Sequence, residues 1–410
     1  MGFPRILKLY RRTMSGEKIY EGVFAVHKPQ GVSSADVIRK LQQHFNPSDL
    51  FRPWLEDEQA RRNRENNFQR KRRRTQRLDV KIGHGGTLDP MATGVLVTGV
   101  GKGTKRLQDF LGCTKEYDTV VLFGAETDTY DRLGKVVRRA PYEHITREAV
   151  EKALEQFRGK IMQRPPIFSA LKVQGKKLYE YAREGKEPPI EIKSRPVEVT
   201  DMRIVEWYEP GTHEYKWPEE EAAADEKAVA EKLLAKEDSL PVAPAADEAG
   251  EADVSSKRKS PPAESAIAEE TNAESTPAVK KQKLSAEGDA APASSEQTDV
   301  PETAETTLAD AQPELSEQSK PQALPAAVKI TMTVSSGFYV RSLAHDLGKA
   351  LGSCGLMSSL IRSRQADFHL DPEKILEYKD LDAGEEVWGP KVKKFLDAWE
   401  KKQANEQASA

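Results

Sequence analysis

The sequence predicts an α+β fold, and two observations support this class. Segments with the apolar alternation of β-strands outnumber clear amphipathic helices. The strands and helices also do not alternate regularly along the chain, as they would in a doubly wound parallel sheet. Strand-like sequence lies on both sides of a long segment without aromatic residues, Pro218 to Ala327, so we expect this segment to interrupt one fold.

The predicted elements follow from periodicity and capping residues. The expected strands are Val23–His27, Gly94–Val100, Glu116–Phe123, Pro196–Trp207 and Val328–Val334. The expected helices begin after the capping residues Ser34 and Thr146, and continue with Leu107–Leu111, Leu178–Arg183, a helix from Arg341, a basic helix at Leu356–Arg364 and a last amphipathic helix around Val392 and Trp399.

Charge is distributed unevenly over the 410 residues, whose formal net charge is −3. Pro218 to Ala327 holds 10 Lys+Arg and 25 Asp+Glu, a net charge of −15, which leaves +12 on the rest. A segment so poor in apolar residues cannot offset its ordering entropy, and we expect it to be disordered. The basic remainder suits a polyanionic partner.

Several classes of protein are disfavoured. Cys113 and Cys354 are the only cysteines, which argues against a disulfide framework or a cysteine-based zinc site. No helix-spaced histidine pair or carboxylate cluster indicates a metal. No apolar run is long enough to span a membrane, so we expect no membrane partner.

Targeting signals lie in three places. The first twelve residues are basic, with no acid before Glu17, which is typical of a mitochondrial targeting segment and equally of a basic tail. Lys257–Lys259 and Lys280–Lys283 are candidate nuclear-import motifs. These signals predict nuclear and mitochondrial localisation, with the cytoplasm as a further compartment.

The segment from Phe45 to Leu78 is polar, and Arg61 to Arg77 contains nine basic residues and one acid. Such a run commonly stays disordered until it meets an anion. Nucleic-acid backbone and an import receptor both fit this charge. The densest part consists of Arg70, Lys71, Arg72, Arg73 and Arg74.

One aspartate lies where a reactive group is plausible. Asp89 precedes Pro90, which disfavours the α region for it, and two glycines, Gly85 and Gly86, leave space nearby. A carboxylate on a tight loop beside a buried strand suits nucleophilic chemistry. An ordinary Asp-Pro turn explains the same residues equally well.

Other candidate residues have simpler explanations when taken singly. Tyr117 heads an apolar strand and reads as a core residue, Arg341 as a surface charge at a helix start, and His84 as a structural residue beside glycines. Lys28 on a turn could contact phosphate or be solvated. The residues alone therefore indicate a basic α+β protein compatible with RNA or DNA, with one candidate aspartate.

Five separated blocks nevertheless resemble the TruB family of pseudouridine synthases, in the same order, and a eukaryotic, fungal-like member in particular. The blocks are Lys28-Pro29-x-Gly31, GHGGTLDPMATGVL from Gly83, KEYDTVVLFG from Lys115, RPPIFSALKVQGKKLYEYAREG from Arg164 and GFYVRSLAHDLG from Gly337, with LIRSRQADF from Leu360 as a weaker sixth. The two long insertions lie outside the resemblance.

The resemblance implies the pseudouridine synthase fold, with a central mixed, mostly antiparallel sheet. It implies isomerisation of the T-loop uridine at tRNA position 55, by base flipping and without cofactor or metal. Asp89 falls on the catalytic aspartate, which acts either at C1′ or on the C2′ proton. Tyr117 falls on the tyrosine that stacks on the target base, and Arg341 on the arginine paired with the aspartate.

The resemblance also implies substrate contacts for His84, Tyr179 and Leu360. We add Lys28 to this group of candidate substrate-binding residues, and assign RNA-backbone binding to the basic run from Arg70 to Arg74. The expected partner is the T arm of tRNA, with mRNA as a further candidate, and the expected state is a monomer.

The expected organisation is a basic tail (1–18), a catalytic domain in two parts (19–217 and 328–370) and a C-terminal helical extension (371–410). The basic insertion (45–78) and the acidic insertion (218–327) interrupt it. About 40 residues follow Leu370, too few for the C-terminal RNA-binding PUA domain of bacterial relatives. Two alternatives remain at this stage: a tRNA-folding chaperone with dispensable catalysis, and a guide-RNA-dependent rRNA pseudouridine synthase.

Overall fold

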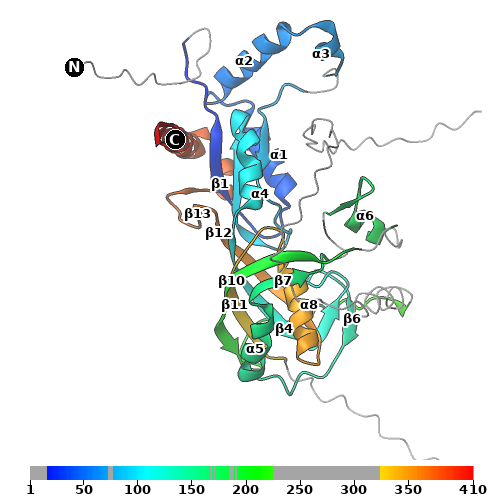
Figure 1. The fold of residues 1–410 in the computed structure, drawn as a ribbon. Helices are drawn as coiled ribbons and strands as arrows, with labels where there is room; N and C mark the ends of the chain where they lie inside the picture. Colours follow the sequence, from blue (N-terminus) through cyan, green and yellow to red (C-terminus); the bar gives the residue numbers. More distant parts are fainter. Residues whose placement is uncertain are drawn as a thin grey trace, which may run out of the picture. The chain divides into compact units, whose positions relative to one another are not determined.

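The fold is organised around one mixed sheet of ten strands, shown in a computed structural model (Figure 1). The strands run in the order β14-β1-β3-β12-β4-β11-β10-β7, with β2 paired to β3 and β13 to β12. Only β1 with β14 and β3 with β12 pair in parallel. The predicted α+β class with a mostly antiparallel sheet is therefore confirmed.

The strands of this sheet are β1 (Gly22–Lys28), β2 (Ile82–His84), β3 (Thr93–Val100), β4 (Lys115–Phe123), β7 (Gly159–Gln163), β10 (Arg195–Tyr208), β11 (Ala327–Val334), β12 (Gly355–Gln365), β13 (Phe368–His369) and β14 (Ile375–Glu377). Two separate hairpins pair β5 (Ala125–Thr127) with β6 (Val136–Arg139) and β8 (Lys172–Val173) with β9 (Lys176–Lys177).

The helices are α1 (Ser34–Phe45), α2 (Arg52–Asn63), α3 (Asn67–Arg72), α4 (Leu107–Gly112), α5 (Arg147–Leu154), α6 (Leu178–Arg183), α8 (Val340–Ala350) and α9 (Glu385–Ser409). Three short 3₁₀ helices, η1 (Gly101–Arg106), η2 (Glu155–Phe157) and η3 (Tyr378–Ala383), complete the set described here. Thr146 caps α5 as predicted, because its side chain accepts a hydrogen bond from the Ala149 N–H.

The structure describes residues 16–72, 77–166, 169, 171–183, 189, 192–224, 227 and 324–409. Arg73, Arg74, the first fifteen residues and both nuclear-import candidates lie outside this range, as does most of the predicted acidic insertion.

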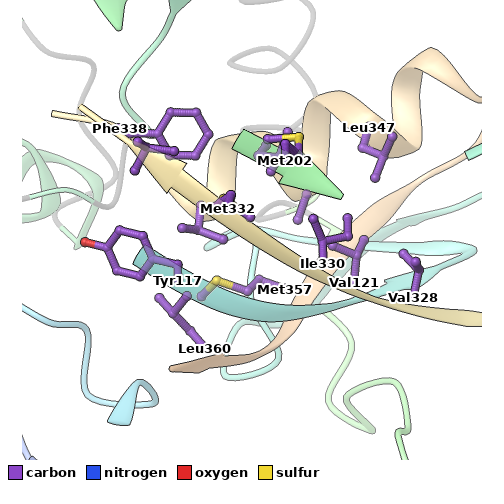
Figure 2. Packing of buried hydrophobic residues seen from close by; sticks show 14 of the residues in the cluster. Tyr117, Val121, Met202, Val328, Ile330, Met332, Phe338, Leu347, Met357 and Leu360 are labelled. Atoms are coloured by element: carbon purple, nitrogen blue, oxygen red, sulfur yellow. The ribbon is translucent and has the colours of Figure 1, made fainter. Parts of the chain in front are cut away.

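Two apolar clusters build most of the core, towards opposite ends of the strand order of the sheet. One lies where α5 and α8 pack on β4, β10, β11 and β12, and Figure 2 shows part of it. The other joins β1 and β3 to α1, α2 and α9, with Phe45 stacked on Phe51 at 4.4 Å and on Trp388 at 4.9 Å. Strands β1 and β3 are buried on both faces, since their remaining apolar residues form a third cluster with Phe110.

The predicted basic helix at Leu356–Arg364 is wrong, because this segment is strand β12. The strand lies between β3 and β4, so its first residues are buried on both faces and show no alternation. Further along the strand, Leu360 and Arg362 are buried, whereas Ile361 and Ser363 are only half-buried. That period of two along the chain distinguishes a strand from a helix.

The segment 45–78 is more ordered than its composition predicted. It forms α2 and α3, and the side chains of Phe45, Phe51 and Trp54 are buried in the cluster beneath α1 and α9. Residues 45–54 are ordered because a few large aromatic side chains supply the burial that a regular apolar pattern would otherwise signal. Disorder was predicted for Arg61–Arg77, and the described part of that run instead ends α2 and forms α3.

The fold also extends into both ends of the predicted acidic insertion. Glu221 forms an isolated bridge with Val136, and Ala222 is buried. At the other end Ala326 and Ala327 are buried, and Ala327 already belongs to β11. Small alanine side chains pack here without the aromatic residues that marked the boundaries in the sequence.

Candidate active site

The loop that carries Asp89 is held through its backbone on the N-terminal side of β3. The Ser34 hydroxyl donates to the Leu88 carbonyl at 3.1 Å and accepts from the Leu88 N–H at 2.9 Å. The Gly31 N–H donates to the Pro90 carbonyl at 2.8 Å. Ser34 was predicted to cap α1, but Ser33 is the capping residue and forms a capping box with Asp36. The Ser34 hydroxyl bonds to the Asp89 loop instead.

Lys28 reaches the same loop from the end of β1. Its Nζ donates to the carbonyls of Pro90 at 3.2 Å and Ala92 at 2.5 Å, and to that of Pro29 at 2.9 Å. The side chain is fully buried, and burial lowers the pKa of Lys28 to about 8. This enclosed amine positions the Asp89 loop, and the predicted substrate contact of Lys28 stays a prediction.

Strand β12 holds the glycine-rich part of the loop. The Arg362 guanidinium donates to the carbonyls of Val95 at 2.7 Å and Gly86 at 3.1 Å. Gln365 donates to the Gly85 carbonyl. Gly94 has φ +117°, and a Cβ there would lie 2.3 Å from the Arg362 carbonyl oxygen. Glycine is required at this position because β3 and β12 approach too closely for any side chain.

Asp89 and Arg341 form a two-point ion pair although 252 residues separate them. The distances are 2.9 Å from Nε to Oδ2 and 3.1 Å from Nη2 to Oδ1. Arg341 is 8% exposed at its side chain and Asp89 is 30% exposed. Fork-to-fork pairing fixes the orientation of a carboxylate, and here it leaves that carboxylate accessible to solvent.

A second carboxylate faces the same guanidinium. Asp131 Oδ2 lies 3.9 Å from Arg341 Nε, and its Oδ1 accepts from Thr129 Oγ1 and the Leu133 N–H, each at 2.9 Å. Burial raises the pKa of the Asp131 carboxyl above its usual value, against the opposing effect of Arg341. Arg341 also donates to the Thr129 carbonyl at 3.2 Å, so the loop before β6 fixes the guanidinium on its other side.

Helix α8 is fixed at the turn that delivers Arg341. The buried amide of Gln163 forms two bonds with the backbone of Tyr339, the N-cap residue of α8. Its Nε2 donates to the carbonyl at 2.9 Å and its Oε1 accepts from the N–H at 2.8 Å. Ser342, one residue after Arg341, donates to the Arg164 carbonyl at 2.9 Å. The end of β7 therefore sets the position of α8.

Tyr117 and Leu360 belong to the apolar cluster that also contains Leu88 and Met91, the neighbours of Asp89. Figure 2 shows Tyr117 with its hydroxyl directed away from the adjoining Met332 and Leu360. Tyr117 pairs across the sheet with Arg362, so both side chains lie on one face. One cluster thus joins the Asp89 loop to the strand of Tyr117 and the helix of Arg341.

The other predicted site residues lie on elements that carry neither Asp89 nor Arg341. His84 ends β2 with its Nδ1 buried, and burial, with the nearby Arg362 charge, lowers the pKa of the imidazole. Tyr179 lies on α6, and its side chain is outside the described part. Arg70 and Lys71 lie on α3 with exposed side chains. Whether these residues contact substrate stays a prediction.

Four site residues were not predicted from the sequence: Asp131, Gln163, Arg362 and Gln365. Asp131 lies in the polar stretch ETDTYD after β4, whose density of carboxylates was the available signal. Arg362 was assigned to a helix that ended one residue before Gln365, which concealed that both side chains face the glycine-rich loop.

No group of three or more His, Cys, Asp or Glu side chains in the described residues is arranged to hold a metal ion. No helix in the described ranges has the length and apolar character needed to cross a membrane.

Comparison with known proteins identifies the family of this chain. Residues 71–218 match the family described as "TruB family pseudouridylate synthase (N terminal domain)". The chain is 38% identical to tRNA pseudouridine synthase 4 of Schizosaccharomyces pombe, over 88% of this chain and 83% of that protein. It is 31% identical to tRNA pseudouridine synthase 4 of Saccharomyces cerevisiae, over 92% and 85% of the two chains.

Similarity extends beyond the fungi. The chain is 45% identical to tRNA pseudouridine synthase B of Phocaeicola vulgatus, over 31% of this chain and 53% of that protein. The chain belongs to the TruB family of pseudouridine synthases.

Proposed function

We propose that this enzyme converts the T-loop uridine at position 55 of tRNA to pseudouridine, with Asp89 as the catalytic aspartate. The observation that carries the proposal is the two-point ion pair between Asp89 and Arg341, on a carboxylate that remains 30% exposed. The names of the relatives support tRNA as the substrate class. The resemblance of the Asp89 block to its family counterpart supports the residue assignment.

The reaction exchanges one glycosidic bond for another. The bond from N1 to C1′ breaks, the detached uracil rotates, and a bond from C5 to C1′ forms. C5 then loses its proton and N1 gains one, so the product is an isomer of the substrate. Asp89 would act at the ribose, either by attacking C1′ or by removing the C2′ proton, and both routes need an ionised and correctly aimed carboxylate.

The surrounding residues suit this role. Arg341 would hold Asp89 in one orientation, so that the carboxylate does not need to reorganise when the ribose arrives. Tyr117 presents its hydroxyl at the edge of the apolar cluster, where an extruded base could stack on the ring. Extrusion of the base costs a few kcal/mol, and stacking would return part of that energy.

Release of tritium from RNA tests this function directly, because pseudouridine formation removes the hydrogen at uridine C5. The substrate is an unmodified T-arm RNA with [5-³H]uridine, and the control RNA has cytidine at position 55. We expect release from the first RNA that is absent from the control. Equal release from both RNAs would contradict the position, and no release from a full tRNA transcript would contradict the function.

A further inference from the structure

The C-terminal end of α2 together with α3, residues 61–72, forms a segment that we call the basic arm. Its base is firmly attached to the core, because Phe51 and Trp54 are buried beside α1 and α9. Glu385 also accepts hydrogen bonds from the backbone N–H groups of Asp49 at 3.1 Å and Leu50 at 2.8 Å. The arm is therefore carried on a fixed base.

The charges along the arm fall into two groups. Arg61 and Arg62 both pair with Glu58, whose side chain is only 8% exposed, so this acid offsets part of their charge. Arg70 and Lys71 form no ion pair within the described ranges of the chain. Within the described part of the arm, the positive charge without an ion pair thus lies on Arg70 and Lys71 of α3 and on Arg64 at the end of α2.

Helix α3 is held by its cap and not by packing. Asn66 Oδ1 accepts from the Gln69 N–H at 2.9 Å, and Gln69 Oε1 accepts from the Asn66 N–H at 3.2 Å, which is the reciprocal pattern of a capping box. The side chains from Asn67 to Lys71 are all exposed. The cap thus organises a helical turn that adds nothing to the core.

Phe68 is the single aromatic residue of the arm, and it is 72% exposed, more than the other large apolar side chains that the structure describes as exposed. Lys71 follows it by three positions, so the ring and the ammonium lie on the same face of the helix. An aromatic ring beside cations is the pattern by which proteins bind unpaired nucleotides, since the ring stacks on a base and the cations contact phosphates.

We infer that α3 is an RNA-binding element in which Phe68 stacks on an unpaired base of the substrate RNA while Arg70 and Lys71 contact the adjacent phosphates. This inference rests on the proposed RNA substrate and extends the contact surface beyond the Asp89 site. Stacking and charge contribute separately to RNA affinity. Stacking requires an unpaired base and does not depend on salt concentration. Phosphate contacts release counterions, so their contribution falls as the salt concentration rises.

The test measures the Kd of an unmodified tRNA transcript and of a blunt RNA duplex at several salt concentrations. We expect Phe68→Leu to weaken tRNA binding about fivefold or more, to leave duplex binding unchanged and to keep the salt slope. Phe68→Trp should restore tRNA binding. The double variant Arg70→Gln, Lys71→Gln should weaken both RNAs and reduce the salt slope by about 1 to 2.

Two matched controls accompany these variants. Val205→Ala alters a 50% exposed apolar residue of β10, and Lys401→Gln removes an exposed charge of α9; both should bind RNA as the unaltered protein does. Unchanged tRNA binding by Phe68→Leu, or an equal loss for tRNA and duplex, would overturn the inference. Tritium release by the unaltered protein tests the proposed function without any of these variants. Failure of this inference can therefore be distinguished from failure of the proposed function.

Discussion

At the scale of single residues, the Asp89 loop is held by buried side chains that bond to its backbone. Lys28, Ser34 and Arg362 all bond to backbone atoms around the Asp89 loop. A buried cation that donates to carbonyls fixes a loop more firmly than neutral groups do, because charge-assisted hydrogen bonds are stronger.

Lys28 makes stability depend on pH. Its pKa is about 8 in the folded protein and 10.5 in the reference state, so between these values the unfolded chain binds more protons. Stability rises with pH wherever the unfolded state binds more protons. We expect the urea midpoint of the unaltered protein to rise relative to that of Lys28→Met from pH 8 to pH 10.

The control for this measurement is Lys401→Met, which removes an exposed lysine of α9. Its midpoint should follow that of the unaltered protein across the same pH range. A difference between the unaltered protein and Lys28→Met that stays constant from pH 8 to pH 10 would mean that Lys28 keeps its proton when buried, against this account.

At the scale of elements, the sequence predicted most strands and helices. It did not predict strand β12, whose Arg362 and Gln365 hold the glycine-rich part of the Asp89 loop. Asp89, Tyr117 and Arg341 were each ambiguous alone, and only the order of the blocks connected them. Strand β12 was misassigned because burial on both faces removes the alternation that marks a strand. The contact of Lys28 with the Asp89 loop is a long-range contact that no local pattern reports.

Gln163 at the end of β7 illustrates how one element positions another. Gln163→Leu keeps the side-chain length but removes both bonds to Tyr339, at a cost of about 1–3 kcal/mol for each buried group left unpaired. We expect kcat to fall by about tenfold to a hundredfold, because Arg341 follows Tyr339 on α8 and is displaced with it. The Kd for RNA should remain close to that of the unaltered protein.

Gln156→Leu provides the matched control, since Gln156 is exposed and makes one hydrogen bond, to the Ala153 carbonyl. This variant should keep both kcat and Kd. If Gln163→Leu loses RNA affinity and kcat in equal measure, or loses stability while kcat is unchanged, then its amide is a structural contact without a role in positioning Arg341.

At the scale of the whole molecule, a continuous sheet brings together segments from both ends of the chain. The Asp89 loop precedes β3, Tyr117 lies on β4, and β12 lies between these two strands in the sheet. Arg341 lies on α8, which packs on β12. The acidic segment lies in the sequence between β10 and β11, and these two strands pair with each other. The site is therefore a product of topology, and no single segment contains it.

The central claim is that Asp89, oriented by Arg341, performs the chemistry at the ribose. The most direct test is tritium release from T-arm RNA by Asp89→Asn, with Asp109→Asn as the control because Asp109 forms a comparable but exposed pair with Arg106 at 3.0 Å. We predict that Asp89→Asn binds the RNA with an unchanged Kd and releases no tritium, while Asp109→Asn is fully active. Tritium release by Asp89→Asn at the rate of the unaltered enzyme would contradict the account.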